Sequence, residues 1–297
     1  GRIGKRTKRL GELVFERLIA GAYDEGKAQD AARRIAGQFG KVEGEKDKHA
    51  MRIAQLAHIS PAEERAALAL VDRILSGEEL APLKAKNEQD SDLIKLLGSS
   101  EGAADIALFG RMLADEPKFN VDAACQVAHA ISVHGVTVED DYFTAVDDLN
   151  TGDEDAGAAH LGQTEFASAV LYHYVCINAD LLKENCAESE LAVSTIQALI
   201  ESALTVAPTG KQNSFGSRAR ASYAVLERGT QQPRSLCAAF LDPVGRGDQL
   251  AEAIERLKRT QAGFNKVYDD CADATTSFNA LTGEGTLADL LRFVEVA

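Results

Sequence analysis

DDYFTAVDDL (residues 140–149) and AHLGQTEF (159–166) are the stretches on which the fold depends. They are flanked by two segments that carry mostly apolar or aromatic residues at every second position, 121–131 and 166–176. A period of two is typical of β-strands, because successive side chains point to opposite faces. The sequence therefore predicts two strands that flank an excursion over residues 134–165.

The excursion is acidic, contains glycine and includes the loop NTGDED (150–155). A loop of this length inside a compact domain is unusual unless it has a function. It carries the aromatic pair Tyr142 and Phe143, followed by Thr144. An aromatic held beside a sheet can stack on the bases of single-stranded nucleic acid without reacting with them. The alternative is that Phe143 is a buried residue closing a small core within the excursion.

The remaining pattern is mostly helical. Residues 1–104 have apolar residues at helical spacing, including Ile53, Leu56 and Ala57, and a helix start at Ser60-Pro61. The other predicted elements are a polar loop at 77–92, a buried strand at 105–109, a helix at 188–205, a glycine-bearing loop at 209–220, a strand at 222–226, and helices thereafter, the last at 286–296.

The order of strand, excursion, strand, helix and strand is compatible with an α+β protein that contains a ferredoxin-like or RNA-recognition-type sheet. It is not the alternation of helices and strands that a dinucleotide-binding domain requires. The chain contains neither GxGxxG nor GxxxxGK[ST], so no phosphate-binding nucleotide loop is indicated.

Composition limits the class of protein. The 297 residues are 45% hydrophobic and 26% charged, which is ordinary for a globular protein, and no apolar run is long enough to span a membrane. The net charge of −14 argues against nucleic-acid binding, unless the acidic residues lie away from the binding groove. Five cysteines without a CxxC motif predict free thiols in a reducing cytoplasm, and no zinc cluster.

Histidines and aspartates near the excursion raise the possibility of a metal site. They are His129, His134, His160, Asp147 and Asp148. No HExxH motif is present, and an apolar strand face is the usual place for a core histidine such as His129. We expect no metal, no cofactor and no catalytic residue. The alternative hypothesis is a metal-dependent RNase.

DIALFGRM (105–112), VAHAIS (127–132), DDYFTAVDDL and AHLGQTEF together resemble the motifs of the CasC family, the backbone subunit of the type I-E CRISPR Cascade complex. Weaker similarity extends through GKQNSF (210–215) and TQAGFN (260–265). The resemblance implies a modified RNA-recognition palm, a helical fingers domain and a protruding thumb.

The resemblance also implies a function. Copies of the subunit would form a helical filament on CRISPR guide RNA and would displace one nucleotide at regular intervals with the thumb. The guide would be left ready to pair with the target DNA strand in antiviral defence, together with other Cascade subunits. Residues 1–104 would be the fingers, 105–133 palm strands, 134–170 the thumb, and 171–297 the rest of the palm with C-terminal helices. The family's first palm strand is expected to be absent.

The resemblance suggests RNA-binding residues. Phe143, Tyr142, Thr144 and Leu161 would act on a base from the thumb, and Met112 would pack against the displaced nucleotide. Arg111 would contact phosphate or, alternatively, form a surface salt bridge. The loop residues whose donors suit a sugar-phosphate backbone are Lys211, Gln212, Asn213 and Ser214. The basic cluster KRTKR (5–9) either lies on RNA or is a solvated charge run.

Overall fold

A computed structural model describes residues 2–78, 103–115, 117–145 and 160–295. Every sheet that it shows has two strands. The chain divides into two compact units, and each is described by itself. The first unit comprises residues 1–126, 176–219 and 291–297, and the second comprises residues 127–175 and 220–290.

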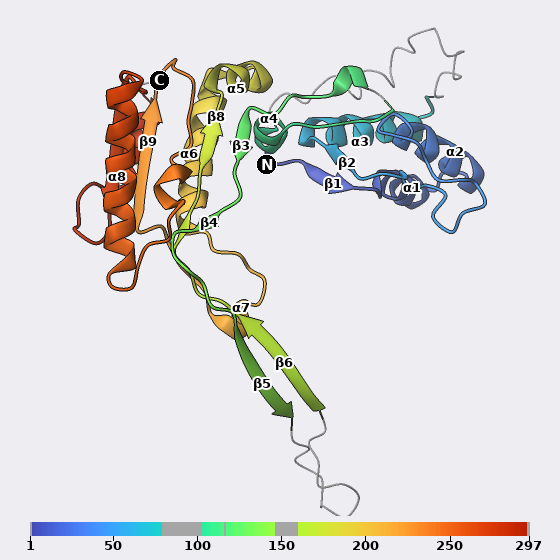
Figure 1. Ribbon diagram of the computed structural model, residues 1–297. Helices are drawn as coiled ribbons and strands as arrows, with labels where there is room; N and C mark the ends of the chain where they lie inside the picture. The colour runs from blue at the N-terminus through green and yellow to red at the C-terminus, as the bar shows by residue number, and fades with distance from the viewer. Residues whose placement is uncertain (1, 79–102, 116, 146–159, 296–297) are drawn as a thin grey trace, which may run out of the picture. The chain divides into compact units, whose positions relative to one another are not determined.

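Three helices near the N-terminus of the first unit share one hydrophobic core (Figure 1). They are α1 (Leu10–Ala20), α2 (Glu25–Ala36) and α3 (Pro61–Leu75). The predicted start of α3 is confirmed as a capping box. Ser60 Oγ accepts a hydrogen bond from Glu63 N at 3.1 Å, and the Glu63 carboxylate accepts one from Ser60 N at 2.8 Å.

A short antiparallel sheet accompanies these helices. It is formed by β1 (Lys5–Thr7) and β2 (Ala57–Ile59). The helical pattern predicted within residues 1–104 is wrong at these two strands. All three residues of β2 are buried, and a short run that is buried on every side gives no periodicity by which to tell a strand from a helix.

The strand predicted at residues 105–109 is also wrong, because this segment is helix α4 (Ala104–Phe109). Three consecutive residues, 106–108, are buried, which again hides the period. Gly110 ends the helix with a φ of 75°, a left-handed conformation that favours glycine. The rest of the first unit contains η2 (Pro117–Phe119), α5 (Ala179–Cys186), α6 (Ser189–Thr205) and α7 (Gln212–Phe215). Helix α6 confirms the helix predicted at 188–205, whereas α7 replaces part of the predicted loop at 209–220.

The two strands predicted around the excursion are interrupted. The observed strands are β3 (Cys125–Val127), β4 (Ile131–Ser132), β5 (Glu139–Ala145), β6 (His160–Phe166), β7 (Leu171–Tyr172) and β8 (Val175–Ile177). Strand β3 pairs with β8, β4 with β7, and β5 with β6. Within the second unit, backbone hydrogen bonds from Ala128 N to Tyr174 O and from Val133 N to Val170 O continue this antiparallel ladder. The excursion is therefore the outer part of a long two-stranded ribbon.

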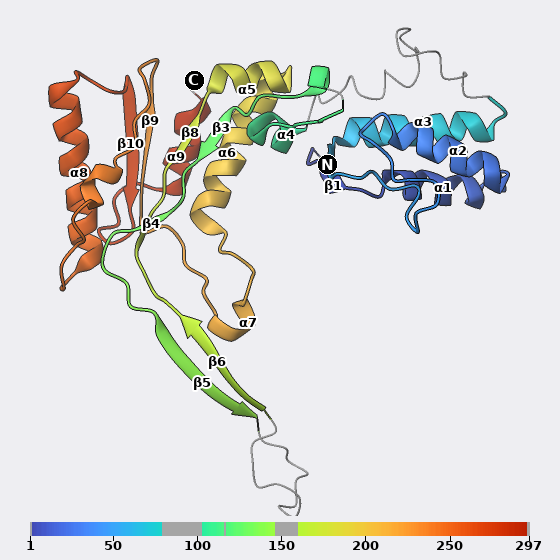
Figure 2. The same cartoon turned by 45° about the vertical axis from the view of Figure 1, so that its right-hand side comes forward.

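A second antiparallel pair completes the second unit. Strand β9 (Tyr223–Arg228) confirms the predicted strand at 222–226, and β10 (Ala274–Asn279) was predicted as helical. Helix α8 (Gln249–Val267) lies beside these strands (Figures 1 and 2). A small core joins α8 and η3 (Cys237–Phe240) to the ribbon, and helix α9 (Leu287–Glu295) matches the predicted last helix.

All five cysteines are free thiols. Burial raises the pKa of the Cys125 and Cys186 thiols, which keeps them protonated and unreactive near neutral pH. No helix among the described residues has the length and apolar character that crossing a bilayer would require.

Candidate nucleic-acid interface

Strands β5 and β6, here called the hairpin, form a seven-residue ladder that runs from the pair Glu139–Phe166 to the pair Ala145–His160. Neither strand pairs with any other strand that the structure describes. All seven residues of β5 are exposed. An isolated two-stranded hairpin is at best marginally stable in water, so an element exposed in this way is suited to contact a partner.

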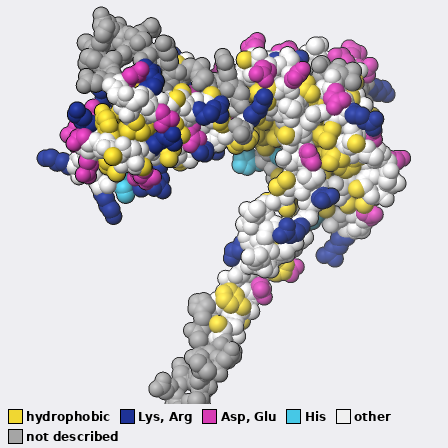
Figure 3. Space-filling model, turned by 180° about the vertical axis from the view of Figure 1, so that it is seen from behind, with side chains coloured by type: hydrophobic (Ala, Val, Ile, Leu, Met, Phe, Trp, Pro, Cys, Tyr) yellow, Lys and Arg dark blue, Asp and Glu magenta, His cyan; other side chains and the backbone are white. Residues whose placement is uncertain are grey.

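The register gives the hairpin two different faces. Phe143 lies opposite Gly162 on one face, and Tyr142 lies opposite Gln163 on the other. Tyr142 is 65% exposed and Phe143 is 43% exposed, so neither is sealed in a core. The alternative that Phe143 closes a small buried core is not what the described residues show. Figure 3 shows hydrophobic side chains at the surface of the hairpin, next to the residues drawn in grey.

Acidic side chains occupy the end of the hairpin nearer its root. Glu139, Asp140, Asp141 and Glu165 are exposed, and Asp140 lies directly across from Glu165. Like charges in this position repel each other and would also repel phosphate. Binding of a polynucleotide by the hairpin must therefore depend on the rings and not on its charge.

The root of the hairpin, where residues 133–135 meet Val170, is held by the His134 side chain, which accepts a hydrogen bond in place of a backbone carbonyl. Val170 N donates to His134 Nε2 at 3.1 Å, so the proton of the neutral ring is on Nδ1, which donates to Gly135 O at 2.7 Å. The carbonyl of Val133 is thereby left to accept a hydrogen bond from Val244 N at 2.8 Å. Val133 and Val244 are both buried in the small core. His134 is thus a structural residue that joins the hairpin to its unit.

The structure places two further predicted thumb residues, Thr144 and Leu161, in the hairpin. Thr144 is exposed on the same face of the hairpin as Tyr142. Leu161 lies in β6 opposite Thr144, but its side chain is outside the described residues, as is that of His160. Asp147, Asp148 and the loop at 150–155 also lie outside them. No group of three or more possible metal ligands occurs in the part of the chain that the structure describes.

Met112 is 78% exposed, although methionine is more often a core residue. It follows Gly110 and Arg111 at the end of α4. An unbranched thioether at the surface can pack against a flat apolar partner. The position is compatible with the predicted contact to a nucleotide.

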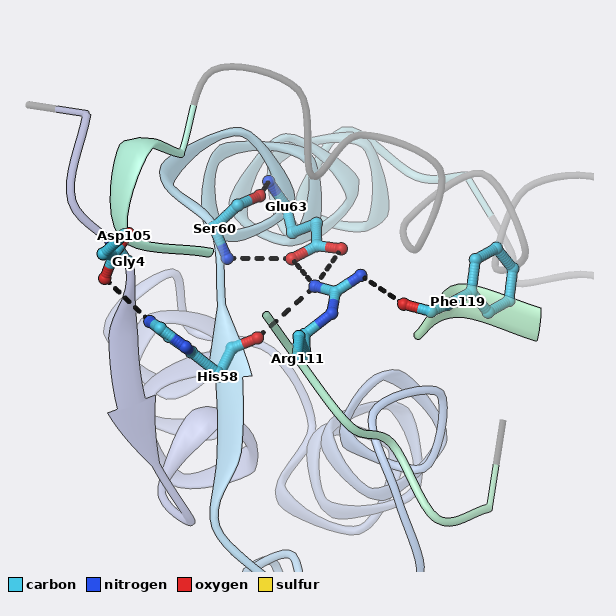
Figure 4. Close-up of polar contacts among 7 residues, drawn as sticks. All are labelled: Gly4, His58, Ser60, Glu63, Asp105, Arg111 and Phe119. Atoms are coloured by element: carbon cyan, nitrogen blue, oxygen red, sulfur yellow. Dashed lines mark hydrogen bonds and ion pairs between the residues drawn. The ribbon is translucent and has the colours of Figure 1, made fainter. Parts of the chain in front are cut away.

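Arg111 is not placed to contact phosphate, which corrects that prediction (Figure 4). Its side chain is 1% exposed, and Nη1 donates to both carboxylate oxygens of Glu63 at 2.8 Å. It also donates to the carbonyls of His58 and Phe119. The sequence suggested a surface salt bridge as the alternative, and the bridge is instead buried. A charge so deeply buried needs a partner, and Glu63 supplies it.

The same network fixes the N-terminal strand. His58 Nε2 lies 2.8 Å from Asp105 Oδ2, and Gly4 N donates to Asp105 Oδ1 at 2.9 Å (Figure 4). A Cβ atom at Gly4 would approach His58 Nε2 to 2.8 Å, so this close contact depends on glycine. Asp105, at the start of α4, therefore links this helix to β2 and to Gly4 directly before β1. The motif DIALFGRM thus contributes to the fold of the unit, and it also contains the exposed Met112.

The predicted backbone-binding loop is partly occupied by its own contacts. Lys211 has a φ of 59° at the start of α7, and Lys211, Asn213 and Ser214 are exposed. The Gln212 amide instead donates to the carbonyls of Pro208 and Ser217 and closes the loop. Gln212 is therefore a structural residue here, whereas its three neighbours are available to a ligand.

The basic cluster at 5–9 is mostly engaged within its own unit. Lys5 pairs with Glu64 at 2.7 Å, Lys8 donates to the Ala54 carbonyl at 2.6 Å, and Arg9 pairs with Glu12. This arrangement favours a solvated charge run with local partners over an RNA-binding surface.

Comparisons with known proteins place the chain in a family. The model of the CT1975-like protein family (Cas CT1975) matches residues 1–291. The chain belongs to this family. No curated protein matches this CT1975-like chain.

Solved structures resemble the CT1975-like chain closely. One is a chain of a CRISPR RNA-guided surveillance complex, pre-nicking. It is 27% identical, with a TM-score of 0.84, over 100% of this chain and 85% of that chain. Another, from a CRISPR RNA-guided surveillance complex, is 30% identical, with a TM-score of 0.58, over 66% of this chain and 77% of that chain. The resemblance to a CRISPR-associated subunit is confirmed at this level.

The sequence did not reveal the structural roles that three residues have around these sites. Gly162, His134 and Glu63 have roles that depend on partners far away in the sequence, 36 residues for His134 and 48 for Glu63. Glu63 was indicated only through the helix start at Ser60, and His134 only as a candidate metal ligand, whereas a signal existed for the role of Gly162. A glycine inside an otherwise regular strand pattern often marks a place where another group approaches closely.

Proposed function

We propose that this chain is a non-catalytic subunit that binds CRISPR guide RNA and forms the backbone of a Cascade complex of type I-E in the cytoplasm. Copies of the chain polymerise along the guide. The hairpin displaces nucleotides at regular intervals, and the intervening bases are presented to the target DNA strand. Its partners are the guide, further copies of itself, other Cascade subunits and the target strand.

The observation that carries the proposal is the exposed hairpin with an aromatic side chain on each face. Base stacking on an aromatic side chain contributes about 1–3 kcal/mol per base and tolerates any sequence. This tolerance is what a subunit needs if the guide varies and base pairing reads the target.

The proposal accounts for the negative charge. A ribbon with four exposed carboxylates is unsuited to bind phosphate, but it can insert rings between bases. Contacts to the sugar-phosphate backbone then come from other residues, such as Lys211, Asn213 and Ser214, whose groups can donate without reading sequence.

The proposal includes a palm of the RNA-recognition type. Residues 105–133 and 171–297 would supply the palm and its C-terminal helices, 134–170 the thumb, and 1–104 the fingers. The pairs β3–β8 and β9–β10 supply antiparallel strands for such a palm.

The test is assembly of the full chain on a single-stranded guide RNA. Wild-type protein should give bases that react at regular intervals with a chemical probe of unstacked nucleotides. The variant Tyr142→Ala/Phe143→Ala should lose this periodic reactivity. A matched control is Tyr268→Ala, which removes an aromatic that is 70% exposed outside the hairpin. Unchanged periodic reactivity in the double variant would refute the role of the hairpin.

The RNase alternative is tested on the same assembly. Guide RNA should stay intact when the purified chain is incubated with Mg²⁺ or Mn²⁺. Cleavage that a chelator abolishes would contradict a non-catalytic subunit and would favour a metal-dependent RNase.

A further inference from the structure

Gly162 lies directly beneath the ring of Phe143. The two residues are cross-strand partners in the hairpin. A Cβ atom on Gly162 would lie 2.8 Å from Cε1 and 3.0 Å from Cε2 of the ring, and closer still to Cζ. The ring therefore leans across the ribbon, and its far edge lies over the glycine.

The backbone itself does not require glycine at this position. Gly162 has no left-handed φ, unlike Gly110 or Gly216, so any residue could adopt its conformation. Glycine inside a strand is less stable than alanine by roughly 0.5–1 kcal/mol, because it loses more conformational freedom on folding. The feature that a larger residue would disturb is the ring of Phe143.

The position of the ring has a consequence for binding. A Phe143 side chain with a Cβ atom beneath it would have to swing away from the ribbon. With glycine beneath, the ring lies along the ribbon surface and stays 43% exposed. A ring covering a glycine across a sheet is a recognised way of fixing strand register. Here the same contact fixes a surface that a planar base can meet.

We propose that Gly162 is a positioning residue that seats the Phe143 ring as a platform for one nucleobase of a single-stranded RNA. The inference rests on the proposed function, since it concerns how the hairpin meets RNA. It adds that the orientation of the ring, and not only its presence, determines base displacement. Because every base has a π-face that can stack on a phenyl ring, the platform accepts any of the four bases.

The test uses the full chain and a set of single-stranded RNAs, each with 2-aminopurine at one position. This base becomes brighter when it leaves the stack, so it reports displacement separately from binding. The variants are Phe143→Ala, Gly162→Ala and the two combined. Gly135→Ala is the matched control, because nothing lies within 4 Å of a Cβ atom there and φ is not left-handed.

Phe143→Ala should weaken assembly on RNA roughly 5- to 150-fold, the equivalent of one lost stack. Gly162→Ala should remove most of the fluorescence rise at the displaced positions and weaken assembly roughly fivefold or more. In the Phe143→Ala background, Gly162→Ala should have no further effect, because the two residues act through one contact. Gly135→Ala should behave as wild type.

The possible failures are distinguishable. If Phe143→Ala leaves both readouts unchanged, the proposed function of the hairpin is wrong. If Phe143→Ala has its effect but Gly162→Ala displaces bases like wild type, the hairpin has its proposed function but Gly162 does not position the ring. If Gly162→Ala weakens assembly on RNA equally with and without the Phe143 ring, the positioning role of Gly162 is also wrong. Thermal unfolding of each variant separates these results from misfolding, and the double variant removes the clash.

Discussion

Arg111 illustrates what a single residue can and cannot reveal. In the sequence it lies between Gly110 and Met112, in the motif DIALFGRM whose resemblance to the CasC family suggested a phosphate contact. In the structure its partner is Glu63, whose side chain is fully buried, 48 residues earlier in the chain. Two opposite charges buried this deeply stabilise the fold mainly because each compensates the other, which would otherwise be a buried charge without a partner.

Arg111→Met should therefore destabilise the protein by about 3–5 kcal/mol, because it leaves the Glu63 carboxylate buried and unpaired. Denaturant unfolding measures the effect. Arg17→Met is the control, since the Arg17–Asp72 pair is exposed and should contribute less than about 1 kcal/mol. Adding Glu63→Leu to Arg111→Met should restore part of the loss. Equal losses in Arg111→Met and Arg17→Met would refute this account.

At the scale of elements, α8 and β9 are joined by a partly buried ionic group. Arg234 donates to both carboxylate oxygens of Glu227, and Gln261 Nε2 on α8 donates to Glu227 Oε1 at 2.7 Å. Burial acts to raise the pKa of Glu227, but the hydrogen bonds from Arg234 and Gln261 outweigh it. The pKa is therefore lowered below its ordinary value.

A lowered pKa in the folded state means that Glu227 stabilises the fold when it is ionised. This contribution is present above the pKa of the unfolded chain, about 4.3, and is lost as the pH falls through the folded-state value. Glu227→Gln should lower the unfolding free energy at pH 7 and make its fall between pH 5 and pH 3 shallower. Glu255→Gln, at an exposed surface pair, should leave that slope unchanged. A wild-type slope in Glu227→Gln would contradict the assignment.

The elements also show where sequence patterns suffice. Helices α6 and α8 are long and amphipathic enough to be predicted, and Ser60 with Glu63 marks the start of α3 by chemistry that is local in sequence. Short buried runs such as α4 and β2 carry no period, so their type depends on the neighbours they pack against. Strand β10 was missed although its Thr275 and Thr276 are β-branched, because its only partner in the described structure is β9.

The candidate site likewise contains residues that local sequence identifies and residues that depend on long-range pairing. The aromatics of the hairpin were identified through the resemblance of DDYFTAVDDL to a family motif, which is local in sequence, and their exposure agrees with the role that the resemblance implies. The seat at Gly162 was not found, because it requires the register that pairs it with Phe143, 19 residues earlier. A long-range register is set by the whole ribbon, including the root at His134, and no window of sequence contains it.

For the whole molecule, the hairpin and the rest of the fold should be separable. The described residues of β5 are all exposed, whereas the root is held by His134, Val170 and the buried Val133 and Val244. Replacing residues 137–167 with a short Gly-Ser linker keeps the root. It should change the unfolding free energy by less than about 1 kcal/mol, since no buried side chain among the described residues is removed. Denaturant unfolding and proteolysis measure this.

The same deletion should abolish periodic base displacement while part of the RNA binding remains, since backbone contacts such as those proposed for Lys211 lie outside the deleted residues. Retained displacement would show that another element opens the stack. Extensive unfolding would show that the hairpin belongs to the core of its unit. Retained stability together with lost displacement is expected of an element whose exposed rings serve RNA and not folding.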